Sequence, residues 1–276
     1  MAGAGRGDSP LRVGLIGFGA AGRRLAEAIV AGDAGRCELV AVLVRTPDKI
    51  SADVQRGIGC LVTNDAGEFL ATQMDLVVEV AGHDALRAYA EDALRQGKDL
   101  LVSSVGAFAD VAFQERVWRL AHDRGRRVYL ATGAIAGLDA IASAAVGGLE
   151  SVTHLVRKPP RGLLPPDDAA AVERSGQPRE LYNGPAREAA LRFPENVNVA
   201  AAISLAGLGL DKTTVRVVAD PTVERNTHEI EARGEFGDLR VVLRNIPTEN
   251  PKTGRLTAMS MIKALRNLTA PVVVGL

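Results

Sequence analysis

Three glycines near the start of the chain have the spacing of a loop that binds a pyrophosphate. Gly17-Phe18-Gly19-Ala20-Ala21-Gly22 follows the apolar run 11–16 and precedes an alanine-rich helical stretch that extends to residue 30. In such a turn, the first glycine permits the sharp bend, the second lets a phosphate approach the backbone, and the third lets helix and strand pack closely. The helix N-terminus attracts the anion through its N–H groups and dipole. We therefore predict that residues 17–22 bind a dinucleotide.

The end of the second predicted strand indicates which dinucleotide is bound. An NAD-binding protein usually carries Asp or Glu there, which accepts hydrogen bonds from the ribose. This chain has Arg45, whose guanidinium suits a 2′-phosphate. The alternative is that Arg45 is solvated and that Asp48 binds the ribose. We expect NAD or NADP as the cofactor, with NADP accepted and Arg45 favouring it, and Ala81, after the third predicted strand, as a further contact.

Four histidines are the side chains suited to moving protons near neutral pH. His122 lies in an arginine-rich helical stretch and is expected to be solvated. His83 follows the third predicted strand, where a loop role is favoured over lining the cofactor cleft. His154 and His228 lie in strand-like segments, and residue type alone favours a structural role for each.

Apolar runs alternate with helical segments over the first half of the chain. Unbroken apolar runs are typical of strands buried on both faces. The pattern predicts a parallel, doubly wound sheet of the Rossmann type, in an α/β fold. The predicted strands are 11–16, 38–44, 75–80, 99–103 and 127–131, and the clearest helices are 84–96 and 112–124.

The pattern changes after Gly133, and a second α+β domain with a mixed sheet is expected. Its predicted strands alternate apolar and polar residues, which indicates one buried face. Segment 159–176 is expected to be a surface loop, because it contains prolines, a glycine and charges. A predicted helix at 137–147 precedes strands 152–157, 214–219, 228–233 and 239–244. The expected domains are 1–133 for the dinucleotide, 134–253 for substrate, catalysis and oligomerisation, and 254–276 as a helix that packs back on the first domain.

Composition excludes several classes of protein. Of 276 residues, 47% are hydrophobic and 24% are charged, which is typical of a globular protein. Basic and acidic residues both number 33, so no net charge attracts nucleic acid or an anionic membrane. The two cysteines form no metal-binding pattern, and no apolar stretch approaches the roughly 18 residues of a membrane span. We expect a cytoplasmic protein that binds no metal, nucleic acid or membrane.

Motifs in the second half carry a specific resemblance. They are Gly133-Ala134-Ile135-Ala136-Gly137-Leu138-Asp139, Asn196-Val197-Asn198-Val199-Ala200-Ala201, Ala219-Asp220-Pro221, Asn226-Thr227-His228-Glu229-Ile230, Asn245-Ile246-Pro247 and Asn250-Pro251-Lys252-Thr253. With the glycine loop, they make the chain resemble the L-aspartate dehydrogenase family over nearly its whole length. The long segment 159–179 matches little of that family, so substrate contacts there are open.

The resemblance implies oxidative deamination of L-aspartate through iminoaspartate to oxaloacetate and ammonium, and a supply of iminoaspartate to NAD biosynthesis. It makes His228 the active-site histidine, against the odds set by residue type, and makes Ala134 and Asn198 cofactor contacts near the nicotinamide. It also implies a homo-oligomer, a homodimer or homotetramer. Lys252 and Thr253 are candidates for binding the substrate carboxylates, although a turn that begins a helix explains them equally well.

Two other functions remain open from the sequence. One is another two-domain reductase, of the homoserine dehydrogenase or dihydrodipicolinate reductase type, because a shared fold does not fix the substrate. The segment around His228 argues against both. The other is a non-catalytic dinucleotide sensor, which binds reduced cofactor without turning over an amino acid.

Overall fold

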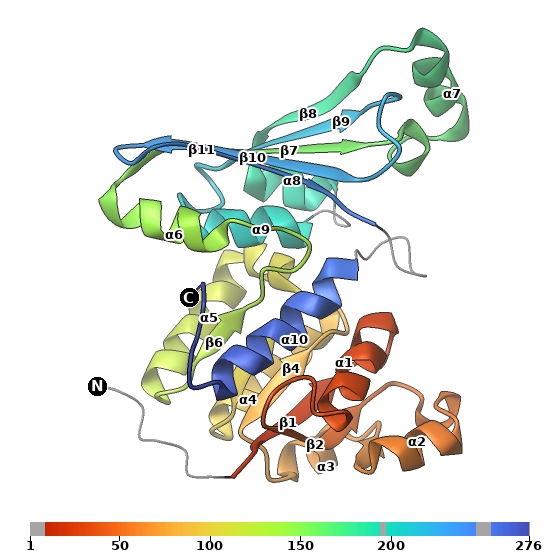
Figure 1. The fold of residues 1–276 in the computed structure, drawn as a ribbon, viewed down its shortest axis with the longest axis vertical. Coiled ribbons are helices and arrows are strands. Elements are labelled where there is room, and N and C mark those ends of the chain that lie inside the picture. The colour runs from red at the N-terminus through yellow and green to blue at the C-terminus, as the bar shows by residue number, and fades with distance from the viewer. Residues whose placement is uncertain (1–8, 194–196, 247–254, 276) are drawn as a thin grey trace. The chain divides into compact units, whose positions relative to one another are not determined.

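The computed structural model describes residues 9–193, 197–246 and 255–275, and the chain divides into two compact units (Figure 1). The first unit contains residues 1–131 and 258–276, and the second contains residues 132–257. Within the described ranges, no helix combines the length and apolar character needed to cross a membrane.

A six-stranded parallel sheet forms the centre of the first unit. The strand order is β3-β2-β1-β4-β5-β6, the order of a dinucleotide-binding Rossmann sheet. The fold-class prediction is therefore confirmed for this unit. Its strands are β1 (Leu11–Ile16), β2 (Cys37–Leu43), β3 (Leu61–Thr63), β4 (Leu76–Glu79), β5 (Asp99–Val102) and β6 (Val128–Leu130).

The sequence prediction placed five of these strands and omitted β3. Three residues are too few to show a period of apolar residues, so only the pairing with β2 identifies β3 as a strand. The helices of this unit are α1 (Ala20–Val30), α2 (Ala52–Ile58), α3 (Ala66–Ala71), α4 (His83–Arg95), α5 (Val111–Asp123) and α10 (Arg255–Thr269), with short 3-10 helices η1 (Pro47–Lys49) and η2 (Val105–Ala109).

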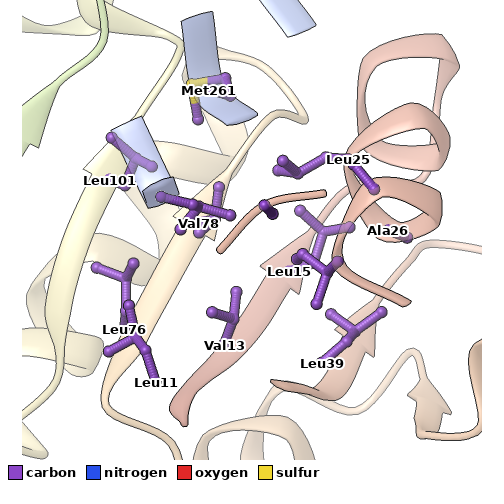
Figure 2. Close-up of a cluster of buried hydrophobic side chains, with 14 of the residues drawn as sticks. Leu11, Val13, Leu15, Leu25, Ala26, Leu39, Leu76, Val78, Leu101 and Met261 are labelled. Carbon is purple, nitrogen blue, oxygen red and sulfur yellow. The ribbon is translucent and has the colours of Figure 1, made fainter. Parts of the chain in front are cut away.

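Helices α1 and α10 share one face of this sheet. Met261 and Leu265 of α10 are fully buried in a cluster with side chains of β1, β4 and α1, several of which Figure 2 shows around Met261. A hydrogen bond also anchors the C-terminal end of α10, because the backbone N–H of Arg36 donates to Oγ1 of Thr269 over 3.2 Å. A helix from the end of the chain thus completes the core of the first unit.

A mixed five-stranded sheet forms the second unit, in the order β11-β10-β7-β9-β8. Strands β7 and β9 are parallel, and the other neighbours are antiparallel. The predicted mixed sheet is confirmed, with β8 as a strand that the sequence analysis did not predict. The strands are β7 (Leu149–Lys158), β8 (Arg179–Pro185), β9 (Thr214–Ala219), β10 (Thr227–Gly234) and β11 (Gly237–Arg244).

One face of this sheet is covered by helices, as the alternation of apolar and polar residues predicted. The helices are α6 (Leu138–Gly147), α8 (Ala186–Arg192) and α9 (Val197–Ala206), which lie along the same side of the strands in Figure 1. Ile141 of α6 and Ile203 of α9 are fully buried against Ile230 of β10. On the opposite face, Arg240 of β11 forms exposed ion pairs with Glu229 and Glu231 of β10.

The prediction of a loop over 159–176 is wrong. A short 3-10 helix, η3 (Pro160–Gly162), and a ten-residue helix, α7 (Pro166–Ser175), occupy this segment. Proline at the first helical position is preset for a helix, and Asp167 and Asp168 complement the helix dipole in the first turn. Gly176 ends the helix in a left-handed conformation. The residues taken as loop signals are therefore helix-end signals.

Truncation of Met261 tests the contribution of α10 to the core. We expect Met261→Ala to lower the free energy of unfolding by about 2–5 kcal/mol, because a buried side chain is replaced by a cavity. Met259→Ala on the same helix is the matched control, since Met259 is 43% exposed and should change stability by less than roughly 0.5 kcal/mol. Equal effects in urea unfolding would contradict the packing of α10 described here.

Candidate functional site

The glycine loop between β1 and α1 is shaped by two close contacts. Gly17 has φ +99°, and a Cβ atom on it would lie 2.8 Å from Cβ of Ala81. A Cβ atom on Gly22 would lie 2.2 Å from the carbonyl oxygen of Gly17. The first glycine therefore serves the turn and the approach of Ala81, and the third serves the packing of helix on strand.

Gly19 differs from the other two, because a Cβ atom there would meet no atom within 4 Å. Packing inside the protein does not require glycine at this position. Gly19 is the N-cap of α1, where no side chain caps the helix and no acidic residue lies in the first turn. Open space before an uncapped helix N-terminus fits the pyrophosphate of a dinucleotide, which a side chain on residue 19 would displace.

A buried carboxylate fixes the loop that follows β4. Glu79 is fully buried, and its Oε1 accepts hydrogen bonds from the backbone N–H groups of Ala81 and Gly82 over 2.7 and 2.8 Å. Ser104 donates to the same carboxylate through its backbone N–H and its hydroxyl. Glu79 thereby holds Ala81, a predicted cofactor contact, against Gly17.

Both ribose candidates lie beyond the carboxyl end of β2. Arg45 follows the strand by two residues, and Asp48 lies in η1, and both side chains are exposed. Both candidates therefore lie where a Rossmann sheet binds the adenosine ribose of its cofactor.

His228 and His154 form a buried pair on neighbouring strands. His228 of β10 lies opposite Val156 of β7, and His154 lies opposite Ile230, so both rings project from the helix-covered face of the sheet. Nδ1 of His228 and Nε2 of His154 are 3.1 Å apart, with the ring centroids 5.3 Å apart. His228 is 5% exposed and His154 is 0% exposed. The sequence analysis treated the two histidines separately and missed their contact.

The surroundings of the pair keep both rings neutral at pH 7. Burial and the charge of Lys158 lower the pKa of His228 to about 4. Burial and the neighbouring His228 lower the pKa of His154 well below its usual value. Each imidazole therefore has one nitrogen with a proton and one without.

Lys158 is a site residue that the sequence analysis missed. It lies on β7 with the spacing His154, Val156, Lys158, so the three side chains share one face. The residue is only 9% exposed. A lysine in the apolar register of an alternating strand was the available signal, because lysine is rarely buried without a functional or structural partner.

The predicted nicotinamide contacts also lie in the second unit. Ala134 is in the turn before α6, and its carbonyl oxygen accepts a hydrogen bond from Nδ2 of Asn245 over 2.9 Å. Asn245 is 7% exposed, so a buried side chain stabilises the turn that contains Ala134. Asn198 lies in the first turn of α9 with an exposed side chain. Lys252 and Thr253 lie outside the described residues.

The other two histidines lie in the first unit. His83 is the first residue of α4 and not part of a loop, and it lies in the first unit. The side chain of His122 on α5 is 90% exposed, as predicted.

Two family models match most of the chain. The model described as "Aspartate dehydrogenase, C-terminal" matches residues 139–268, and the model described as "Homoserine dehydrogenase, NAD binding domain" matches residues 17–131. The prediction of a nicotinamide dinucleotide cofactor is supported by the second match, which includes the glycine loop.

Relatives extend the likeness over the full length. The chain is 41% identical to an L-aspartate dehydrogenase of Methanosarcina barkeri, over 96% of this chain and 99% of that protein. It is 40% identical to an L-aspartate dehydrogenase of Bradyrhizobium diazoefficiens, over 97% of this chain and 95% of that protein. The chain belongs to the L-aspartate dehydrogenase family. The resemblance predicted from the motifs is thus confirmed.

Solved structures agree with the L-aspartate dehydrogenase family. The crystal structure of aspartate dehydrogenase from Thermotoga maritima has a TM-score of 0.76 and 27% identity, and covers 96% of this chain and 99% of that chain. A homoserine dehydrogenase from Thiobacillus denitrificans has a TM-score of 0.63 at 14% identity, over 97% of this chain and 76% of that chain, which shows a shared fold alone.

The lowered pKa of His228 predicts a loss of stability in acid. An unfolded histidine has a pKa near 6.5 and the folded His228 one of about 4, so between these values the unfolded chain binds a proton that the folded chain does not. The free energy of unfolding should therefore fall by about 3 kcal/mol from this group as the pH drops from 7 to 4.

A comparison of urea unfolding at several pH values checks this expectation. His228→Leu removes the titrating group, so its stability should depend less steeply on pH than that of the unmodified protein. If both proteins lose stability in parallel, His228 ionises in the folded state near its ordinary pKa and the prediction is wrong.

Proposed function

We propose that this chain catalyses the reversible oxidative deamination of L-aspartate, through iminoaspartate, to oxaloacetate and ammonium, with a nicotinamide dinucleotide. The observation that carries the proposal is the buried His228 in a chain that is 41% identical over nearly its full length to an L-aspartate dehydrogenase. On the same face of the sheet, His154 is a hydrogen-bond partner of His228, and Lys158 supplies a positive charge.

The assignment of the two ends of the dinucleotide follows the sequence analysis. Residues 17–22 and Ala81 hold the pyrophosphate end, and Ala134 and Asn198 hold the nicotinamide end, as the family resemblance implies. When bound, the nicotinamide supplies the site that accepts a hydride from the α-carbon of aspartate. Arg45 makes NADP an accepted cofactor and favours it through a charge-assisted hydrogen bond to the 2′-phosphate.

His228 acts on the substrate through Nε2, because its Nδ1 is committed to His154. Imine hydrolysis requires that a proton leave the attacking water and that another reach the departing nitrogen. His228 serves both transfers as general base and general acid. A bound substrate with two carboxylates raises the pKa of His228 from its value in the free protein towards neutrality, because nearby negative charge favours the imidazolium.

Lys158 is the cation that we assign to a substrate carboxylate. It lies close enough to His228 to lower the pKa of that ring by its charge, and both side chains project from one sheet face. A dianionic substrate needs such donors, and burial strengthens each charge-assisted hydrogen bond. Lys252 and Thr253 remain predicted partners for the same substrate.

The remaining sequence predictions concern the oligomeric state, cellular location and metabolic role of the protein. A homodimer or homotetramer, a cytoplasmic location and a contribution of iminoaspartate to NAD biosynthesis stay predictions that follow from the family resemblance and the composition.

The assay of the proposed reaction measures reduced-nicotinamide absorbance with oxaloacetate, ammonium, and NADH or NADPH in parallel. We expect consumption that requires both oxaloacetate and ammonium, with NADPH accepted. His228→Ala should lower kcat by about 10²–10⁴-fold, the contribution of a positioned acid–base group. His122→Ala, which removes an exposed histidine of the first unit, is the matched control and should leave kcat unchanged.

Three outcomes would separate the alternatives. Cofactor binding without turnover favours a dinucleotide sensor. Turnover with a different carbonyl substrate favours another reductase of the same fold. Full activity of His228→Ala removes this histidine from the chemistry.

Replacement of Lys158 tests the carboxylate assignment. Lys158→Met should raise KM for oxaloacetate by about 10–100-fold, because a charge-assisted hydrogen bond contributes about 1.5–3 kcal/mol. The same change should raise the pKa of His228, because the lowering charge is gone. Arg216→Met on β9, whose guanidinium pairs with Glu180, is the control and should change neither quantity. An unchanged KM in Lys158→Met would remove the assignment.

A further inference from the structure

The contact between His154 and His228 admits two arrangements of protons. Both rings are neutral, so each carries one proton on its two nitrogens. Either Nε2–H of His154 donates to Nδ1 of His228, or Nδ1–H of His228 donates to Nε2 of His154. The first arrangement leaves the proton of His228 on Nε2, and the second leaves Nε2 bare. These two forms meet a substrate in opposite ways, one as a donor and one as an acceptor.

The far nitrogen of His154 decides between them. Nδ1 of His154 is fully enclosed and has no hydrogen-bond partner among the residues that the structure describes. In the second arrangement this atom carries a proton, and a buried N–H is left without an acceptor. In the first it is a bare nitrogen. Orphaned buried N–H groups are rarer than under-satisfied acceptors, so the first arrangement is favoured.

We infer that His154 is a positioning residue that donates from Nε2 to Nδ1 of His228 and so holds the proton of His228 on Nε2. The register of β10 against β7 sets the residues opposite each ring and so keeps the two histidines in contact in the folded protein. Because Nδ1 of His228 accepts this bond, Nε2–H is the group that His228 presents.

The inference deepens the proposed function and rests on it for its catalytic consequence. In the direction of amination, His228 meets the carbonyl oxygen of oxaloacetate as a neutral hydrogen-bond donor. A neutral imidazole in this role polarises the carbonyl and stabilises the negative charge that develops on oxygen as ammonia adds. The opposite tautomer would place a lone pair against that oxygen and repel it. Because a protonated Nε2 cannot accept a second proton, the step of imine hydrolysis in which His228 takes a proton from water requires that opposite tautomer, so the resting form is set for amination.

Nitrogen NMR of the full chain labelled with ¹⁵N-histidine tests the tautomer directly, without cofactor or substrate. At pH 7 we expect the Nε2 resonance of His228 at a position typical of a protonated nitrogen and the Nδ1 resonance at that of a bare one. Assignment uses His228→Leu and His154→Leu, which each remove one of the four sets of signals. A bare Nε2 and a protonated Nδ1 on His228 would overturn the inference.

Three variants separate the hydrogen bond from packing. His154→Leu introduces an apolar side chain and removes the donor, so we expect a mixture of tautomers on His228 and a drop in kcat of about 10–100-fold, the size expected from loss of a buried hydrogen bond. His154→Gln places an amide N–H near the position of Nε2 and should restore the Nε2–H form and much of kcat. Val156→Ala loosens the packing directly opposite His228 and should leave the tautomer unchanged.

The readouts keep the inference separate from the proposed function. Absence of turnover in the unmodified protein counts against aspartate dehydrogenation, while the NMR spectrum still decides the tautomer. An unchanged tautomer in His154→Leu, or a mixed tautomer in Val156→Ala, would show that His154 does not hold the proton. Should His154→Leu fail to fold, the spectrum of the unmodified protein still decides the tautomer, and His154→Asn, whose shorter amide does not reach the position of Nε2, removes the donor in its place.

Discussion

The register of β10 against β7 is the constraint on which the candidate site depends. It sets Val156 opposite His228 and Ile230 opposite His154. Because side chains alternate along a strand, this single pairing places two imidazoles and the ammonium of Lys158 on the apolar face. A shift of one residue would move His228 to the polar face of the sheet, where water would restore its ordinary pKa. The hydrophobic pairs of the sheet therefore also determine the protonation of the site.

The first unit follows a different rule, since its predicted contacts with the pyrophosphate are made by backbone. Gly17 and Gly22 shape the loop, Gly19 leaves open space before the helix, and the buried carboxylate of Glu79 beside the loop accepts hydrogen bonds from backbone N–H groups and from Ser104. Such a surface recognises a pyrophosphate by shape and dipole and needs no cation. The second unit supplies the ionisable side chains that are assigned to the substrate and to proton transfer. The proton chemistry is thus assigned to the second unit.

Local sequence signals predicted most of this structure, and long-range pairing accounts for what they missed. Sequence analysis identified the apolar runs of β1 and β4 and the glycine spacing, because each of these patterns is complete within about a dozen residues. The three residues of β3 have no period of their own. The prolines and charges before α7 mark a helix start as well as a loop, and the choice depends on position in the turn. The contact of His154 with His228 spans 74 residues of sequence, so no local pattern contains it. Lys158 was visible in principle, as a cation in an apolar register.

The placement of α10 also bears on how the chain folds as it is made. The first unit is discontinuous, because residues 132–257 separate most of it from Met261 and Leu265. A ribosome completes the whole second unit before it supplies those two side chains. Until then the apolar face of β1 and β4 that they cover is open to water. Docking of α10 also closes a chain loop of more than a hundred residues, whose entropy cost grows only slowly with length and amounts to about 4 kcal/mol if the loop is flexible. A second unit that has already folded shortens the effective loop, so the order of synthesis favours completion of the first core last.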